Sequence, residues 1–144
     1  MGTREMIAVE VLLWGLVAGL VHFVAIVVLY GSPLVKRIYA ADSEVSPPAR
    51  IGSDRPRAMS TRLLGTQIEV YIMTIGFAWL HPLLPVHGLA GAMLLAGLFA
   101  ALRVYPPVWA LWIQGAYSNG YLFVEVLGGV SGTVVVMLAL YFLM

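Results

Sequence analysis

Long apolar runs constrain this chain most, because few folds other than a membrane bundle can accommodate them. Residues 7–30 are apolar or small except for Glu10 and His22. A helix needs about 20 apolar residues to cross about 30 Å of hydrocarbon. By this rule four segments qualify as membrane spans: residues 6–30, 63–80, 88–102 and 120–143. The sequence therefore predicts an all-α fold, an integral membrane four-helix bundle that forms a single domain over residues 1–144.

The composition supports the same environment. Hydrophobic residues make up 61% of the chain and charged residues 10%, whereas a soluble domain carries about 25% charged residues. The net charge of +1 offers no concentrated basic surface for phosphates, so no nucleic-acid partner is expected. The chain has no cysteine, which excludes disulfides, thiolate metal sites and cysteine nucleophiles. The high apolar and low charged content makes the lipid bilayer the first expected partner.

The last third of the chain allows two interpretations. Proline is tolerated in the first turn of a helix and breaks one that precedes it, so Pro106 and Pro107 predict a helix start. The triplet at residues 118–120, Ser-Asn-Gly, predicts a break. We expect a short interfacial or re-entrant helix over residues 107–117 before the final span. The alternative is one long tilted helix over residues 107–144.

Charge asymmetry predicts the orientation. Residues 31–62 hold six of the eight basic residues, and loops rich in Lys and Arg stay on the cytoplasmic side. This segment is therefore expected to be a cytoplasmic loop, irregular around residues 43–56. The N-terminus, the connection at residues 81–87 and the C-terminus would then lie outside a cell (inner) membrane.

Ionisable side chains inside the spans are the first candidates for a functional site, because burying a charge in a membrane is costly. Glu69 and Glu125 are predicted at similar depth near the cytoplasmic side, where two facing carboxylates could share a proton. Arg103 and Gln114 are candidate partners for either carboxylate. The alternative is that each glutamate only satisfies a structural hydrogen bond. Glu10, in the first span, is a further candidate.

Glycine pairs predict where helices pack closely. Gly15 and Gly19, and likewise Gly128 and Gly132, form G-x-x-x-G patterns, and small residues at this spacing let membrane helices approach. We expect these contacts within one chain, with contacts between subunits as the alternative.

His22 lies in the first span on the face that carries Gly15 and Gly19. A lone intramembrane imidazole could bind a metal or haem, relay a proton, or act as a hydrogen-bonded packing residue. His81 and His87 belong to an outer connection and are expected at the wrong depth to be a second ligand. We therefore favour packing and expect neither metal nor cofactor. Nucleotide-binding and hydrolase motifs are absent from the sequence.

Two resemblances supplement these patterns. Residues 30–40 (YGSPLVKRIYA) resemble the turn after the first helix of a small bacterial four-helix membrane family of unknown function, and residues 110–129 resemble its last helix. That resemblance implies a fold and no activity. More loosely, residues 57–69 and 101–105 are similar to membrane-associated proteins of eicosanoid and glutathione metabolism. This chain departs from that family's glutathione-binding pattern, because Thr66 and Gln67 stand where an Asn is expected.

The function suggested by the sequence is that of a non-catalytic accessory or assembly component of a membrane complex. Its partners would be other membrane protein subunits or further copies of the chain. The alternatives are a proton-coupled small-molecule carrier that uses Glu69 and Glu125, and a membrane enzyme that acts on a lipophilic substrate.

Overall fold

The computed structural model describes residues 3–45, 55–115 and 117–144. This part of the chain folds into α-helices with one short 3-10 turn and no strand. In chain order the elements are α1 (Thr3–Gly31), α2 (Pro33–Val45), α3 (Arg55–Leu80), η1 (His81–Leu83), α4 (Gly88–Gln114) and α5 (Asn119–Leu143). The all-α bundle predicted from the sequence is confirmed.

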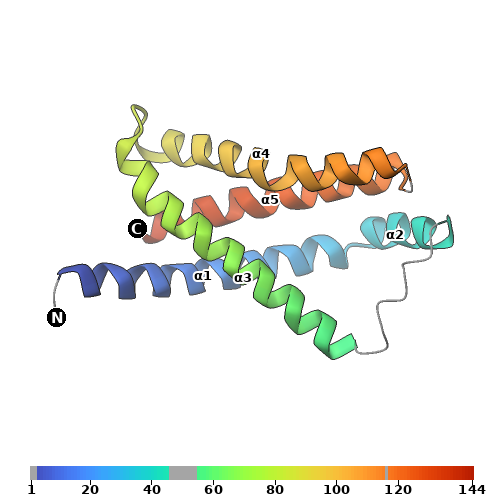
Figure 1. Ribbon diagram of the computed structural model, residues 1–144, viewed down its shortest axis with the longest axis horizontal. Helices are drawn as coiled ribbons and strands as arrows, with labels where there is room; N and C mark the ends of the chain where they lie inside the picture. The colour runs from blue at the N-terminus through green and yellow to red at the C-terminus, as the bar shows by residue number, and fades with distance from the viewer. Residues whose placement is uncertain (1–2, 46–54, 116) are drawn as a thin grey trace.

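Four of these helices are long and apolar enough to cross a membrane. The candidate spans are Ala8–Gly31 in α1, Leu63–Leu83 in α3 and η1, Gly88–Gln114 in α4 and Asn119–Leu143 in α5. Successive spans run in opposite directions, so the two chain termini lie at one end of the bundle and α2 lies at the other (Figure 1). The protein is therefore an integral membrane protein by the length and composition of its helices.

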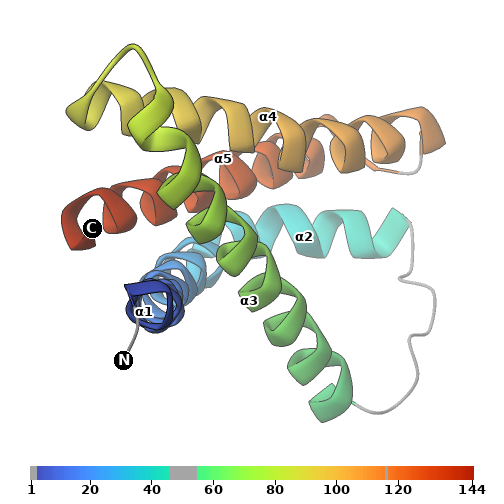
Figure 2. The ribbon, with the colours of Figure 1, turned by 60° about the vertical axis from the view of Figure 1, so that its left-hand side comes forward.

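The centre of the bundle is α5, which packs against α1, α3 and α4. Helices α4 and α5 lie side by side and antiparallel, while α3 crosses α1 obliquely (Figures 1 and 2). Buried residues from all four spans form one core, including Ala18, Val70, Leu95, Val136 and Met137. The beginning of α3 lies well away from α4 and α5 (Figure 2).

The structure differs from the sequence prediction at Pro106 and Pro107, which lie inside α4 and do not begin a new helix. The span expected to end at residue 102 continues to Gln114, and the separate short helix over 107–117 does not form. Each proline removes one backbone N–H, so Leu102 and Arg103 lose the usual donors to their carbonyl groups. In hydrocarbon a full break would leave more backbone groups unbonded, which favours continuing the helix.

The predicted break at residues 118–120 is confirmed, and local chemistry explains it. Gly115 adopts the left-handed conformation (φ 64°), and its N–H donates to the carbonyl of Trp112 at 3.1 Å. Ser118 then caps α5, its Oγ accepting the backbone N–H of Tyr121 at 3.1 Å. A continuous helix over 107–144 is therefore wrong.

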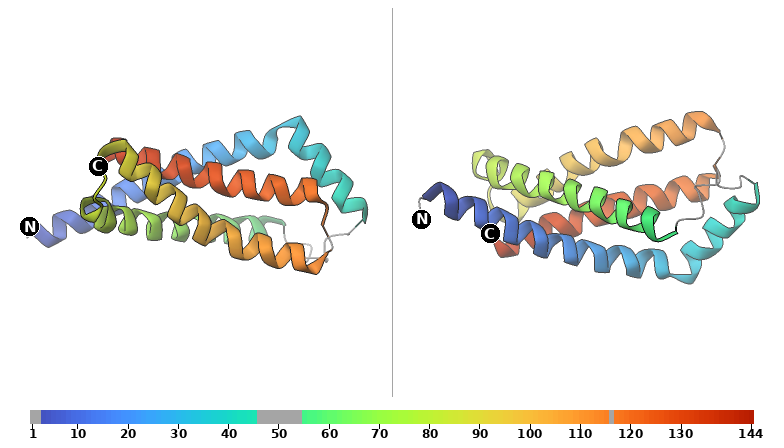
Figure 3. Two further views of the ribbon diagram at one scale, coloured as in Figure 1. Left: turned by 90° about the horizontal axis from the view of Figure 1, so that it is seen from above. Right: turned by 60° about the horizontal axis from the view of Figure 1, so that its bottom comes forward.

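The segment expected to be a loop over residues 31–62 contains α2 and the first turns of α3. Part of the stretch expected to be irregular, residues 46–54, lies outside the described residues. Helix α2 turns sharply away from the end of α1 (Figure 3). Its sequence is amphipathic, and apolar periodicity within an otherwise polar segment is the signal that identifies such a helix.

Candidate functional site

The face of α5 that meets α1 is built from Gly128 and Gly132, both of which are buried. A Cβ on Gly128 would lie 2.7 Å from the hydroxyl oxygen of Tyr30, and one on Gly132 would lie 2.5 Å from Cε1 of His22. The absence of a side chain on these residues therefore leaves room for the polar side chains of α1. This is the close intramolecular approach that the sequence pattern predicts.

His22 is held by this contact. Its side chain is almost fully enclosed, at 2% exposure, and its Nδ1 lies 3.2 Å from the carbonyl oxygen of Gly132. Because a carbonyl can only accept, Nδ1 carries the proton. Among the described residues, no three His, Asp or Glu side chains gather to hold a metal ion. His22 thus serves here as a donor that joins α1 to α5.

The second glycine pair, Gly15 and Gly19 of α1, faces α3. Cβ atoms on these glycines would collide with Tyr71 and Gln67 respectively. Gln67 donates from Nε2 to the carbonyl of Gly15 at 3.1 Å, and Tyr71 donates to the carbonyl of Leu12 at 3.3 Å. Because these glycines have no side chains, the donors of α3 reach the backbone of α1. Their hydrogen bonds therefore fix how α1 and α3 cross.

An ion pair joins α3 to α4 near the middle of the bundle. Arg103 donates from Nε to Oε2 of Glu69 at 2.6 Å, and from Nη1 to the hydroxyl of Thr133 on α5 at 3.4 Å. Thr133 in turn donates to the carbonyl of Gly129 at 2.8 Å. The sequence left open whether Arg103 pairs with Glu69 or with Glu125. The structure shows the pair with Glu69, and the contact with Thr133 extends it to a third span.

This ion pair is not enclosed by the chain. The side chain of Glu69 is 49% exposed and that of Arg103 is 24% exposed. Glu69 lies six residues after Leu63, the first residue of its span, which is a depth of about 9 Å by the helical rise. The half-exposed carboxylate of Glu69 therefore lies at the surface of the chain, within the candidate span.

The exposed face around Glu69 is contiguous along α3. Gly65, Ile68, Glu69 and Ile72 recur at i, i+3, i+4 and i+7, so they share one side of the helix. Ile68 and Ile72 are 60% and 59% exposed, and a Cβ on Gly65 would meet nothing within 4 Å. We call these four residues the α3 face.

Glu125 is held at a different place. Its Oε1 accepts a hydrogen bond from the phenol of Tyr39 on α2. The ring of Tyr39 also makes edge contacts with Tyr30 and Tyr121, with centroids 5.8 and 4.8 Å apart. Burial, followed by the Glu125 carboxylate, raises the pKa of Tyr39 above its ordinary value of 10.0, so the phenol remains a donor. This cluster docks α2 onto the beginning of α5.

The two carboxylates therefore bond to different partners. The Glu69 site reaches α5 at Thr133, eight residues beyond Glu125, which is about 12 Å along the helix. The expected sharing of a proton between them is not the arrangement observed. Their partners explain the difference, because Arg103 donates to Glu69 and Tyr39 donates to Glu125.

The remaining candidates lie apart from both sites. Glu10 is exposed near the beginning of α1, and Gln114 is the exposed last residue of α4, about 16 Å along that helix from Arg103. Neither lies among the polar contacts of Glu69 or Glu125 described above.

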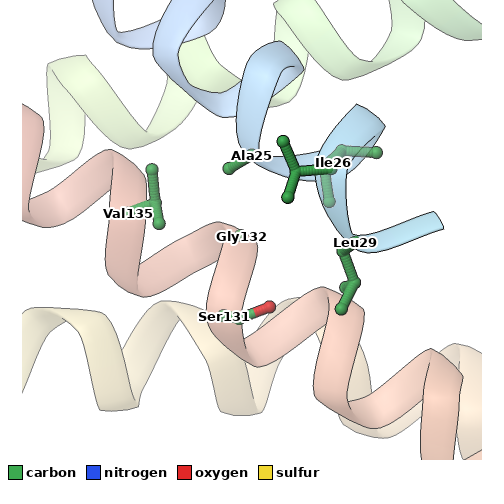
Figure 4. A pocket seen from close by; sticks show the side chains of 7 residues that line it. Ala25, Ile26, Leu29, Ser131, Gly132 and Val135 are labelled. Carbon is green, nitrogen blue, oxygen red and sulfur yellow. The ribbon is translucent and has the colours of Figure 1, made fainter. Parts of the chain in front are cut away.

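A shallow groove of about 370 Å³ lies between α1 and α5. Ala25, Ile26 and Leu29 face Gly132, Val135 and Ser131 across it (Figure 4). The Ser131 hydroxyl donates to the carbonyl of Leu127 within its own helix at 2.6 Å. The groove therefore presents apolar surface and offers no charged group to a ligand.

Sequence reasoning did not identify three residues on which these contacts depend, namely Tyr39, Gln67 and Thr133. The spacing contained a partial signal. Gln67 and Tyr71 are separated by one helical turn, as are Gly129 and Thr133, so each pair presents its members to the same neighbour. Tyr39 lies in the segment predicted to be a loop, where helical spacing gives no such signal.

Comparisons with known proteins leave the family open. No protein-family model, no curated protein and no solved structure matches this chain. The two family resemblances of the sequence therefore remain hypotheses. The chain is described by its own geometry: a four-span bundle with an exposed ion pair at membrane depth and an amphipathic helix docked at one end.

Proposed function

We propose that the protein is a non-catalytic component of a larger membrane assembly, in which a helix of another subunit or of a second copy packs on the α3 face. The observation that carries this proposal is the half-exposed Glu69–Arg103 pair at membrane depth. Charged groups facing lipid are costly and are normally covered by protein or water. A neighbouring helix would supply that cover.

The shape of the α3 face supports a helix as the covering group. Gly65 provides a position without a side chain beside two exposed isoleucines, and small residues let a second helix approach closely. Arg103 has five N–H donors, of which two make the contacts described above. Leu102 and Arg103 also have carbonyl groups without their usual helical donors. A partner helix with polar side chains could accept from the other N–H groups of Arg103 and donate to these two carbonyl groups.

Site-specific photocrosslinking tests this proposal in native membranes. A photoreactive residue at Ile72 should crosslink to a protein, while one at Val24, which is 60% exposed on α1 and lies outside the groove between α1 and α5, serves as the matched control. Purification in mild detergent followed by native mass measurement should then show a stoichiometric complex. A monomeric mass, with only lipid adducts at Ile72, would contradict the proposal.

The proposed orientation places α2 and the beginning of α3 in the cytoplasm and the N-terminus outside the cell (inner) membrane. It rests on the six basic residues of segment 31–62. Cysteines introduced at Gly2 and Ser53 should react with an impermeant reagent from opposite sides. Reaction of both from the same side would overturn this orientation.

A proton-coupled carrier is the second candidate, favoured by the polar contacts that follow α5 along its length. They join His22 to Gly132, Arg103 to Thr133 and Tyr39 to Glu125. Under this proposal Glu69→Gln should abolish proton-coupled uptake in liposomes while the protein still folds. Under the assembly proposal the same variant should weaken the complex and leave proton flux at the background of empty liposomes.

A further inference from the structure

Helix α2 begins abruptly after the first span. Ser32 accepts the backbone N–H of Val35 at its Oγ (3.4 Å) and that of Lys36 at its carbonyl (3.1 Å). Pro33 opens the helix, where its fixed φ is favourable. Since the candidate span of α1 ends at Gly31, the first turns of α2 lie next to the boundary of the hydrocarbon.

One side of α2 is attached to the bundle. Val35 is 5% exposed, and Tyr39, one turn later, donates to Glu125 and packs its ring against Tyr121. Residues four apart share a helix face. These contacts fix the rotation of α2 about its own axis.

The surface of α2 that is free of these contacts carries Lys36 and Arg37, both exposed. Successive residues are about 100° apart on a helix, so Arg37 points almost directly away from Val35 and Tyr39, and Lys36 lies on the flank between Val35 and Arg37. Leu34 projects between the docked and the basic sides and is 69% exposed. Over residues 34–37 the free surface of α2 therefore combines two cations with one large apolar side chain.

We infer that α2 is a binding site for anionic phospholipids, with Lys36 and Arg37 contacting the headgroup phosphates and Leu34 entering the acyl region. Two features favour an anionic phospholipid: the positive charge of Lys36 and Arg37, and their position next to the end of the α1 span. Basic side chains next to a span lie at the depth of the phosphates, and interfacial helices insert their apolar side chains below that level. The Tyr39–Glu125 hydrogen bond positions α2 so that both contacts can form together. This site lies at one end of the bundle and does not depend on the α3 face.

Spin-labelled lipids can test the inference in the reconstituted full-length protein. Association of labelled phosphatidylglycerol, relative to labelled phosphatidylcholine, is measured in phosphatidylcholine bilayers. Each cation near an anionic surface contributes a preference of about fivefold. The variant Lys36→Gln/Arg37→Gln should therefore reduce the preference for phosphatidylglycerol by up to about 25-fold.

The control variant also removes two positive charges, but from the beginning of α3. Arg55→Gln/Arg57→Gln should retain most of the preference, because it leaves Lys36 and Arg37 in place. Equal loss in the two double variants, or no loss with Lys36→Gln/Arg37→Gln, would overturn the inference. Soluble glycerol phosphate should not displace the labelled lipid. Displacement would identify a site for a soluble phosphate and would also overturn it.

Discussion

Replacing Gly132 by alanine probes a close packing contact between α1 and α5. The new Cβ would lie 2.5 Å from Cε1 and 3.1 Å from Nδ1 of His22. His22 is 2% exposed and hydrogen-bonded to the same residue, so it has little room to move. The variant must therefore separate α1 from α5 locally.

The expected magnitude follows from three contributions. Overpacking costs about 1–3 kcal/mol, and losing the His22 hydrogen bond costs about 0.5–1.5 kcal/mol. The intrinsic preference of helices for alanine over glycine returns about 0.5–1 kcal/mol. Gly132→Ala should thus lower the free energy of unfolding by about 2 kcal/mol, measured by reversible denaturation in mixed detergent micelles with tryptophan fluorescence.

Gly97→Ala is the matched control, because nothing lies within 4 Å of its new Cβ. It should raise the free energy of unfolding by at most about 1 kcal/mol. In a His22→Ala background the penalty at Gly132 should largely disappear, giving a coupling energy of about 2 kcal/mol. Equal effects of the two glycine variants, or zero coupling, would refute the packing argument.

Two further outcomes are expected. Changing Pro106 and Pro107 together to alanine restores two backbone donors inside α4 and should raise the free energy of unfolding by about 2 kcal/mol in micelles; a decrease would show that the proline rings contribute packing. Tyr39→Phe removes the donor to Glu125 while keeping the ring. It should increase the mobility of a spin label at Ala41, and an unchanged spectrum would show that the hydrogen bond does not hold α2.

Local signals were sufficient for much of the fold. The four spans follow from hydropathy because every backbone group in hydrocarbon must bond within its own helix, and bilayer thickness sets the required length. The end of α5 nearest Ser118 follows from a side-chain cap that involves residues three apart. Both signals depend on near neighbours in the chain. The extent of α4 past Pro106 was missed, because the same prolines break helices in water.

The candidate site depended on information that is not local. Sequence spacing identified Glu69, Glu125 and Arg103 as polar residues of the spans, and depth alone made the two carboxylates plausible neighbours. Their actual partners depend on how each helix is rotated and at what angle it crosses the next. The oblique crossing of α3 brings Glu69 to Arg103, and the docking of α2 brings Tyr39 to Glu125. Since many rotations bury comparable apolar area in lipid, the sequence determined which segments span the membrane, and only the packed bundle decided which polar groups meet.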